Sequence, residues 1–484
     1  MTRMARRLNS VALCVIIVLC ILLIYASNRI SLSPFSSAPP DEFMRTIKIH
    51  NSHRQYNQQN YYANNNNNNY NAIDNANRHS AKYNHIMHPH NTEQRSHHRF
   101  IGGAQTSESA TVATTNFINM TVRIEDIVEA QRQRIASKMK DFEYTDQMIG
   151  LSALTPETNG QPIQSVILST WRSGSTFLGD ILNAMPGNYY HYEPLLYYDI
   201  QQIRGPPDST EAINTLRQLL KCNYTGLDEY LDYGQGHHFL FTHNTRLWKN
   251  CQLYPQFCWE PNFLNPFCRL FPFQSMKVVR LRAALSEPLL IDPALNVRIV
   301  LLIRDPRATI QSRKHRDWCP GQSDCDSPAI LCKDMVSDYK AAEILTNKYP
   351  LRFKAIRYED LSLDPFKMTK EILNFYGLPF DADVEEFLDS HTRTDIGGVS
   401  STFRDSKTAP FHWMRDLSWY EIEQIQKHCT EAMSMWGYKK AENEDTLMGT
   451  IFNPLVQFPF ADNTAAAVAG LAAQNEQQSD RKNG

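Results

Sequence analysis

The sequence predicts an α/β protein in which helices cover both faces of a parallel sheet. Between residues 160 and 440, short apolar runs alternate with segments of helical spacing, and this alternation is typical of a three-layer α/β domain. Two of the runs, Val166–Leu168 and Val297–Ile303, are apolar throughout except for Arg298. Strands that are buried on both faces show such continuous apolar runs. Both runs are followed at once by a tight turn and a helix start, so we expect a ligand site where they end.

The N-terminal segment predicts a membrane anchor. Residues 1–7 contain three arginines, and residues 8–26 form an uncharged apolar run about long enough to span a bilayer. The basic flank predicts a cytoplasmic tail at 1–7 and a single-pass type II protein whose remaining residues lie in the Golgi lumen. A cleaved signal peptide is the alternative, because residues 24–26 form an acceptable cleavage site, but the apolar run is longer than a usual signal core.

Residues 27–120 and 460–484 differ in composition from the rest of the chain. The first segment is polar and repetitive, with an unbroken asparagine run at 64–69, and lacks the periodic apolar residues that a core requires. It predicts a disordered stem, although its histidines could also bind metal: His85, His88, His90, His97 and His98. The second segment, rich in Ala, Gln and Asn, predicts a loose C-terminal tail. The net charge of −2 argues against a nucleic-acid partner.

The cysteines predict disulfide bonds in an oxidising compartment. Of ten cysteines, Cys14 and Cys20 fall in the anchor and the other eight beyond the stem. No pair has C-x-x-C spacing, which argues against a zinc site, and the spacing leaves the connectivity of the eight open. Asn119 and Asn223 stand in glycan acceptor motifs, which fits a luminal location.

The first motif follows the Val166–Leu168 run. Gly174 allows the backbone to approach a ligand closely, and Ser175 and Thr176 are suited to begin a helix. Such a turn directs backbone N–H groups, the positive end of a helix, two hydroxyls and the Arg172 cation at one place. It therefore predicts a phosphate or sulfate site, with an ordinary strand-turn-helix corner as the alternative.

An acidic residue among aromatic ones follows the first helix. Glu193 lies in the segment Tyr189–Pro194, and an apolar environment would raise its pKa towards that of a general base. A surface acid before a proline is the alternative interpretation. If Glu193 is not the base, His191 is the next candidate.

Three more strands are expected further along the chain. Residues 206–273 show little periodicity and predict an irregular insertion over the mouth of the site. Beyond it, Ser275–Leu281, Val297–Ile303 and Phe353–Leu361 read as strands, and the second of these, being the most apolar, is expected to be central. Helices are expected at residues 124–139, 333–348, 365–376 (closed by Gly377) and 418–436.

The second motif begins where the Val297–Ile303 strand ends. Pro306 sets a helix start, so Arg304 lies at the carboxyl end of the strand and Ser312 two helical turns further on. Together with Arg307 and Arg313 they suit a phosphomonoester, because arginine offers a planar bidentate fork. Arginines paired on a surface helix are the alternative.

These motifs resemble those of Golgi carbohydrate sulfotransferases. Arg172–Leu178 is similar to the family's 5′-phosphosulfate loop, and Arg304–Ala308 with Ser312–Arg313 to its 3′-phosphate motif. Tyr192–Pro194 and Arg357–Leu361 also resemble family segments, and the likeness covers about residues 162–438. Within the family, the motifs most resemble those of the branch that sulfates position 6 of N-acetylglucosamine, galactose or N-acetylgalactosamine.

The resemblance implies a P-loop-like fold and a co-substrate, 3′-phosphoadenosine 5′-phosphosulfate (PAPS), with no metal. It implies that Arg172 and the loop N–H groups hold the 5′-phosphosulfate, that Arg304 and Ser312 hold the 3′-phosphate, and that Glu193 deprotonates the sugar hydroxyl. The catalytic residues would be Glu193 and Arg172. The residues expected to bind the donor are Arg172, Ser173, Gly174, Ser175, Thr176, Phe177, Arg304, Arg307, Ser312, Arg313 and Arg404.

The chain departs from the family pattern in places. Thr176 stands where serine is common, which keeps the hydroxyl, while the insertion, stem and tail have no clear match. The partner is expected to be a glycan or proteoglycan acceptor, and a homodimer stays open. A nucleotide kinase or ATPase is the rival enzyme class, but the loop lacks the leading glycine and the lysine of G-x-x-x-x-G-K-[ST]. A non-catalytic Golgi protein is a third interpretation, although Arg172, Arg304 and Ser312 are all present.

Overall fold

A computed structural model of the chain describes residues 122–145, 150–393, 402–403, 405–449 and 452–461. The expected anchor at 8–26, the stem, the end of the C-terminal tail and Arg404 lie outside these ranges. Within them, no helix combines the length and the apolar character needed to cross a bilayer. The predicted anchor thus stays a prediction.

Five parallel strands form a single sheet within the described part of the chain. They are β1 (Ile163–Leu168), β2 (Asn188–Tyr192), β3 (Phe273–Val278), β4 (Val297–Ile303) and β5 (Phe353–Arg357). Their order across the sheet is β2-β3-β1-β4-β5, and every neighbouring pair is parallel. The parallel sheet is confirmed, with a correction: β1 occupies the middle, and the more apolar β4 lies beside it.

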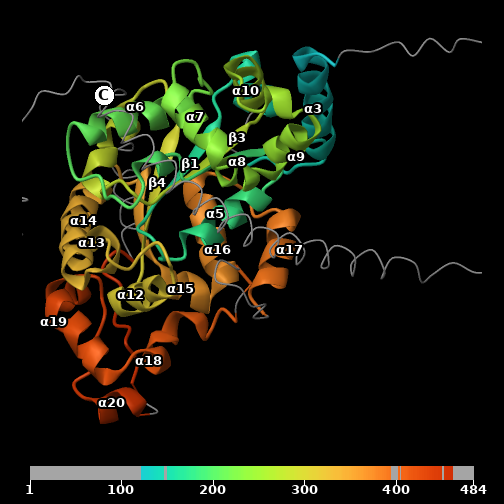
Figure 1. Cartoon of the computed structure of the whole chain (residues 1–484). Coiled ribbons are helices and arrows are strands. Elements are labelled where there is room, and N and C mark those ends of the chain that lie inside the picture. Colours follow the sequence, from blue (N-terminus) through green and yellow to red (C-terminus); the bar gives the residue numbers. More distant parts are fainter. Residues whose placement is uncertain (1–121, 146–149, 394–401, 404, 450–451, 462–484) are drawn as a thin grey trace, which may run out of the picture. The chain divides into compact units, whose positions relative to one another are not determined.

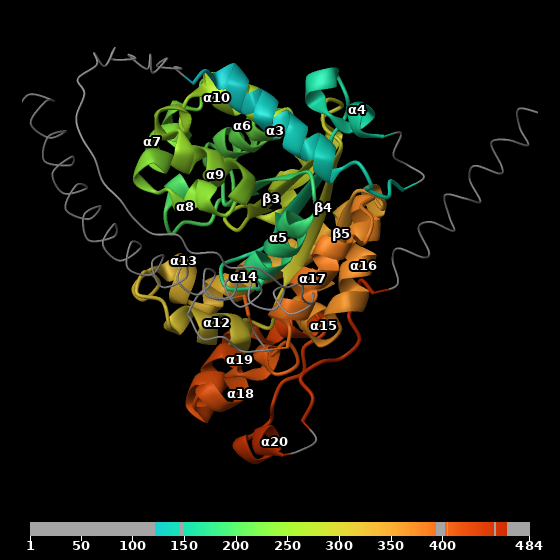
Figure 2. The same cartoon turned by 90° about the vertical axis from the view of Figure 1, so that its right-hand side faces the viewer.

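Helices cover both faces of this sheet, as a three-layer domain requires. On one face lie α5 (Ser175–Ala184) and α16 (Pro365–Tyr376), and on the other α11 (Glu287–Ile291) and α14 (Pro328–Lys348) (Figures 1 and 2). The strands are buried along almost their whole length because both faces are covered. Tyr376 of α16 even donates its hydroxyl to the backbone oxygen of Val166, at 2.9 Å.

The expectation of an irregular insertion at 206–273 is wrong, because this segment is mostly helical. Its helices are α6 (Asp208–Leu220), α7 (Asp228–Gly236), α8 (Phe239–Thr242), α9 (Thr245–Leu253) and α10 (Pro261–Cys268). In α6 the buried apolar side chains Ile213, Leu216 and Leu220 recur at helical spacing. The later helices are short, α10 contains the internal proline Pro266, and aromatic rings in this segment pack on one another.

The remaining helices follow the expected positions closely. α3 (Ile124–Lys138), α16 and α19 (Trp419–Met435) match the prediction within a few residues, and Gly377 ends α16 with a φ of 79°. α14 begins five residues earlier than expected, because Ser327 accepts a hydrogen bond from the N–H of Ile330 and caps it. The other helices are α4 (Leu151–Leu154), α12 (Pro306–Lys314), α13 (Ser323–Asp326), α15 (Tyr358–Leu363), α17 (Ala382–His391), α18 (Trp413–Asp416) and α20 (Glu444–Met448).

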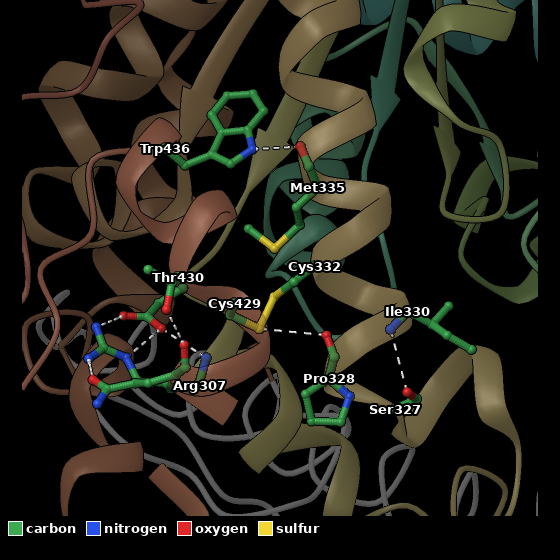
Figure 3. Close-up of a disulfide and its surroundings, with 11 residues drawn as sticks. Arg307, Ser327, Pro328, Ile330, Cys332, Met335, Cys429, Thr430 and Trp436 are labelled. Atoms are coloured by element: carbon green, nitrogen blue, oxygen red, sulfur yellow. Dashed lines mark hydrogen bonds and ion pairs between the residues drawn. A yellow bond between two sulfur atoms is a disulfide. The ribbon is translucent and has the colours of Figure 1, made fainter. Parts of the chain in front are cut away.

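All eight cysteines beyond the stem are paired, which confirms the predicted disulfides. The pairs are Cys222–Cys268, Cys251–Cys258, Cys319–Cys325 and Cys332–Cys429. The last joins α14 to α19 across 97 residues of sequence, and in the same contact the indole N–H of Trp436 donates to the Met335 carbonyl at 2.9 Å (Figure 3). This bridge attaches the C-terminal helices to the sheet domain.

Candidate functional site

The carboxyl ends of β1, β3 and β4 bring the charged residues of the two motifs together. Leu168 at the end of β1 is in register with Val278 of β3 and with Leu301 of β4. The loops that follow these strands therefore start side by side at one edge of the sheet. Each loop carries at least one cation: Arg172, Arg280 and Arg304.

The turn between β1 and α5 has an unusual backbone that one glycine makes feasible. Arg172 and Gly174 have φ values of 67° and 86°, in the left-handed region. A Cβ at Gly174 would stand 2.2 Å from the ring of Tyr358, so no other residue fits there without a shift of the backbone. The turn leads directly into α5, whose first N–H groups have no partner within the helix. The predicted tight turn and helix start are therefore present, and anion binding by them stays a prediction.

The 5′ and 3′ motifs, which lie 140 residues apart in sequence, touch each other. The Arg172 Nε donates to Ser312 Oγ at 3.1 Å, and an Arg304 Nη1 donates to the Arg172 carbonyl at 2.9 Å. The Arg304 guanidinium also stacks 4.7 Å above the ring of Tyr358. Arg172, Arg304 and Ser312, which were expected at the two ends of the donor, thus lie in contact with one another.

Two polar atoms in this place have no partner among the described residues. They are the Oγ of Ser173 and the Nε of Arg304, both shielded from solvent. A buried donor without an acceptor costs about 1–3 kcal/mol, so such atoms are typically satisfied by a ligand or water. Both could donate to the oxygens of a phosphate or sulfate group.

Glu193 lies beside the same loop, but its surroundings differ from the expectation. Its carboxylate binds the Lys277 Nζ at 2.7 Å and an Arg280 Nη1 at 2.8 Å. Burial alone would raise the pKa of Glu193, yet the two cations outweigh burial and lower the pKa to about 2. The expectation of a raised pKa is wrong, because Lys277 of β3 and Arg280 of the loop after it lie where an apolar pocket was expected.

Lys277 connects this carboxylate to the phosphosulfate loop. Its ammonium donates to the Thr176 Oγ1 at 3.1 Å and lies 3.9 Å from the centroid of the Tyr192 ring. Burial alone would lower the pKa of Lys277, but Glu193 offsets burial and the pKa is raised, so the group stays protonated. Lys277 is thus positioned between the candidate base and the hydroxyl at the first turn of α5.

His191, the alternative base, is placed less well. It is 2% exposed, and burial lowers the pKa of its imidazole to about 3. At neutral pH the ring is therefore uncharged and only weakly basic.

Phe177, in the first turn of α5, lies beside the loop. The centroid of its ring is 6.1 Å from that of Phe387 in α17.

Arg307 and Arg313 have a different role from the expected one. Arg307 is fully buried, where its guanidinium binds Asp305 with two N–H groups at 2.7 and 3.0 Å and Gln426 of α19 at 2.9 Å (Figure 3). Arg313 is 1% exposed and donates to the Trp171 carbonyl at 3.1 Å and the Thr170 Oγ1 at 2.7 Å. These two arginines stabilise the fold through buried hydrogen bonds and, for Arg307, an ion pair. Neither side chain is exposed.

Sequence reasoning missed Lys277, Arg280 and Tyr358 as site residues. The signal for the two cations was visible, because a lysine and an arginine within a strand otherwise as apolar as 275–281 need buried partners. Tyr358 gave no such signal, because only the fold brings its ring against Gly174 and Arg304. Within the described ranges, no three His, Cys, Asp or Glu side chains gather as a metal site would require.

Comparison with known proteins agrees with this site. Residues 165–382 match the model of the sulfotransferase family, a span that holds both motifs and Glu193. Carbohydrate sulfotransferase 4 of Mus musculus is 27% identical over 332 residues, which are 60% of this chain and 85% of the relative. Carbohydrate sulfotransferase 6 of Homo sapiens is 26% identical over 333 residues, 58% of this chain and 82% of the relative.

The sulfotransferase domain from the Synechococcus PCC 7002 olefin synthase is one of the solved structures that this chain resembles. It is 17% identical and covers 55% of this chain and 94% of its own, with a TM-score of 0.31. A TM-score this low supports no conclusion about this chain. The match to the sulfotransferase family model covers residues 165–382, a little less than half of the 484-residue chain.

Proposed function

We propose that the protein transfers a sulfuryl group from PAPS to the 6-hydroxyl of N-acetylglucosamine, galactose or N-acetylgalactosamine in a glycan. The enzyme class and the sugar acceptor follow from the family match and from the carbohydrate sulfotransferases that resemble this chain. The contact between Arg172, Ser312 and Arg304 at the N-terminus of α5 carries the proposal, because it joins two anion sites at one sheet edge. The choice of position 6 rests on the likeness of the motifs to that branch of the family.

The donor would be held at both of its charged ends. The Arg172 guanidinium and the N–H groups of residues 173–176 are suited to the 5′-phosphosulfate, and Arg304 with Ser312 to the 3′-phosphate. The Arg172–Ser312 hydrogen bond would be exchanged for bonds to ligand oxygens. The unpartnered Ser173 Oγ and Arg304 Nε supply two of the donors that such oxygens need.

When bound, PAPS supplies the sulfuryl group, and the protein positions and stabilises the developing charge. Glu193 would accept the proton of the attacking sugar hydroxyl. Lys277, bonded both to Glu193 and to Thr176 of the loop, would stabilise the charge that develops on the leaving oxygen. Thr176 keeps the Lys277 ammonium directed at the loop.

A carboxylate with a pKa of about 2 is always ionised at neutral pH but is a weak base. An anionic donor beside Thr176 would draw the Lys277 ammonium away from Glu193. Losing this partner raises the pKa of Glu193, since burial then acts against only one cation, Arg280. The base would thus strengthen when the donor is bound, which favours transfer to sugar over unproductive reactions.

We place the catalytic domain in the Golgi lumen, behind the anchor at 8–26. Four disulfides in the folded domain support an oxidising compartment. Protease added to intact Golgi vesicles should spare the chain beyond residue 120, and an N-terminus beginning near residue 27 would indicate a cleaved signal instead.

The function is tested with the full-length protein, PAPS labelled in its sulfate and a panel of glycans. Labelled sulfate should appear on a sugar that carries a free 6-hydroxyl, and the matching 6-deoxy sugar should accept none. Transfer to both sugars would contradict the position. If the protein binds PAPS but no glycan in the panel becomes labelled, the proposed sulfuryl transfer would be contradicted.

A further inference from the structure

A second group of side chains lies next to the catalytic carboxylate and has no part in binding the donor. Tyr192, the last residue of β2, precedes Glu193 and stacks on His243, with ring centroids 3.8 Å apart and planes 6° from parallel. His243 follows α8, in the helical segment that replaces the irregular insertion expected from the sequence. The stack is half-buried, so part of it is open to solvent.

Asp180 links this stack to the phosphosulfate loop. It lies on α5 four residues after Thr176, so both side chains are on the same face of the helix, one turn apart. Its Oδ1 is 3.7 Å from the His243 Nδ1, and the side chains of Asp180 and His243 are 20% and 33% exposed. Asp180 is therefore shielded but reachable, and no donor-binding role engages it.

Aromatic rings of α17 (Ala382–His391) and of Phe403 extend from Phe177 of α5. Phe387 packs against Phe177 of α5 at 6.1 Å, His391 stacks on Phe387 at 3.9 Å, and Phe403 stacks on His391 at 3.8 Å. Burial lowers the pKa of His391, while the charge of Asp180 opposes that shift, so the carboxylate acts on this ring. Phe177 and Asp180 on α5 are thus flanked by aromatic rings from two separate segments.

We infer that Asp180, His243 and Tyr192, with the rings of Phe177 and Phe387, form the binding site for the acceptor sugar; we call these five residues the acceptor cluster. This inference rests on the proposed function and specifies the sugar that the same site accepts. A pyranose presents C–H groups that pack on aromatic faces and hydroxyls that donate to a carboxylate. A sugar held here has its exocyclic hydroxyl directed towards Glu193, the neighbour of Tyr192.

The charge of the acceptor cluster predicts an uncharged sugar. The cations along this side of the domain are engaged by protein groups: Lys277 and Arg280 by Glu193, and Arg246 by the carbonyls of Asn183 and Met185, each at 2.8 Å. Asp180 would repel a carboxylate of the substrate at short range. The acceptor residue is therefore a neutral hexose or N-acetylhexosamine, and a uronic acid is disfavoured next to it.

The test measures acceptor and donor constants separately for Asp180→Asn and His243→Ala in the full-length protein. Losing a hydrogen bond to a charged group should raise the acceptor KM by about 10- to 100-fold, with the donor affinity changed less than about twofold. The control His238→Ala, an exposed histidine at the start of α8 whose ring contacts Trp248 and Trp259, should leave both constants unchanged. Thermal unfolding of each variant shows whether it is folded.

An acceptor KM within twofold of wild type in both variants would overturn the acceptor cluster, as would equal losses for donor and acceptor. A wild-type protein that binds donor but sulfates no glycan would instead overturn the proposed function. The charge is tested with a neutral disaccharide of N-acetylhexosamine and galactose, and with one in which a uronic acid replaces galactose. Wild type should prefer the neutral one and Asp180→Asn should reduce that preference, whereas a wild-type preference for the uronate would overturn the charge argument.

Discussion

Four arginines of the two motifs fall into two pairs that differ in their surroundings. Arg172 and Arg304 are half-buried; Arg172 donates to Ser312 of α12, and Arg304 donates to the Arg172 carbonyl. Arg307 and Arg313 are almost completely buried and are engaged by carboxylate, amide, hydroxyl and carbonyl oxygens. Arg304, Arg307 and Arg313 lie in one short stretch at 304–313, so residue type and spacing do not separate Arg304 from the other two.

In the core pair several buried oxygens engage each guanidinium, whereas the Nε of Arg304 has no hydrogen-bond partner among the described residues. Removing one partner of a buried pair costs about 3–5 kcal/mol, because the other charge stays behind without compensation. An arginine that faces a ligand loses mainly the ligand contact. Substitutions at the two kinds of position should therefore affect different measurements, stability for one pair and donor binding for the other.

The largest effect is expected at Glu193, where site and core properties meet. Glu193→Gln removes the proton acceptor and should lower turnover by about 10²–10⁴-fold, as loss of a general base does. Some stability is also lost, since Lys277 and Arg280 then lack their anion. Sulfate transfer at saturating acceptor is measured beside donor affinity, with Glu211→Gln on the exposed face of α6 as the control. Retention of more than half the turnover would place the base elsewhere.

The core pair is tested at Arg307. Arg307→Met leaves Asp305 buried without its cation and should lower the free energy of unfolding by about 3–5 kcal/mol. Lys314→Met is the matched control on the same helix, because that lysine is exposed and pairs with Glu421 at the surface, where the effect should stay below about 1 kcal/mol. Denaturant unfolding measures both. Equal stabilities of the two variants would refute the structural role of Arg307.

A carboxylate below the second motif should make stability depend on pH. Burial, and then the charge of Asp305, raise the pKa of Glu359 from 4.5 to about 7, and Tyr438 donates to it at 2.9 Å. A raised acid pKa favours the folded state when the group is protonated. This stabilisation is complete below pH 4.5 and is lost as the pH rises through 7, by about 3 kcal/mol in all.

The measurement is the unfolding free energy at several pH values for wild type and Glu359→Gln. The amide cannot ionise, so the difference between the two proteins should change between pH 4.5 and 8, with wild type losing stability relative to the variant. Parallel curves for the two proteins over this range would show that Glu359 does not titrate in the folded state.

The smallest expected effect on stability is at Arg304. Arg304→Ala removes a ligand-facing guanidinium, so donor affinity should fall by about 10- to 100-fold. The free energy of unfolding should change by less than about 1 kcal/mol, because the protein contacts that are lost are one hydrogen bond and a ring stack. Titration of the nucleotide and denaturant unfolding are measured on one preparation. A large loss of stability would move Arg304 into the same group as Arg307.

The sequence predicted the parallel sheet, the loop before α5 and the position of both motifs where strands of the sheet end, because local apolar runs and turn residues carry that information. It did not predict β2, since the segment Asn188–Tyr192 is aromatic and polar instead of aliphatic and reads as a loop. Nor could it separate Arg307 from Arg304. The partner that buries Arg307, Gln426, lies 119 residues further along the chain and is brought there by α19.

The most direct test of the central claim compares PAPS with an analogue that lacks the 3′-phosphate, in wild type and in Arg304→Ala. If two joined anion sites hold the donor, wild type should bind PAPS at least about 10-fold more tightly than the analogue. That advantage should largely disappear in Arg304→Ala, while the variant binds the analogue almost as wild type does. Equal binding of the two ligands by wild type, or equal losses for both in the variant, would contradict the account.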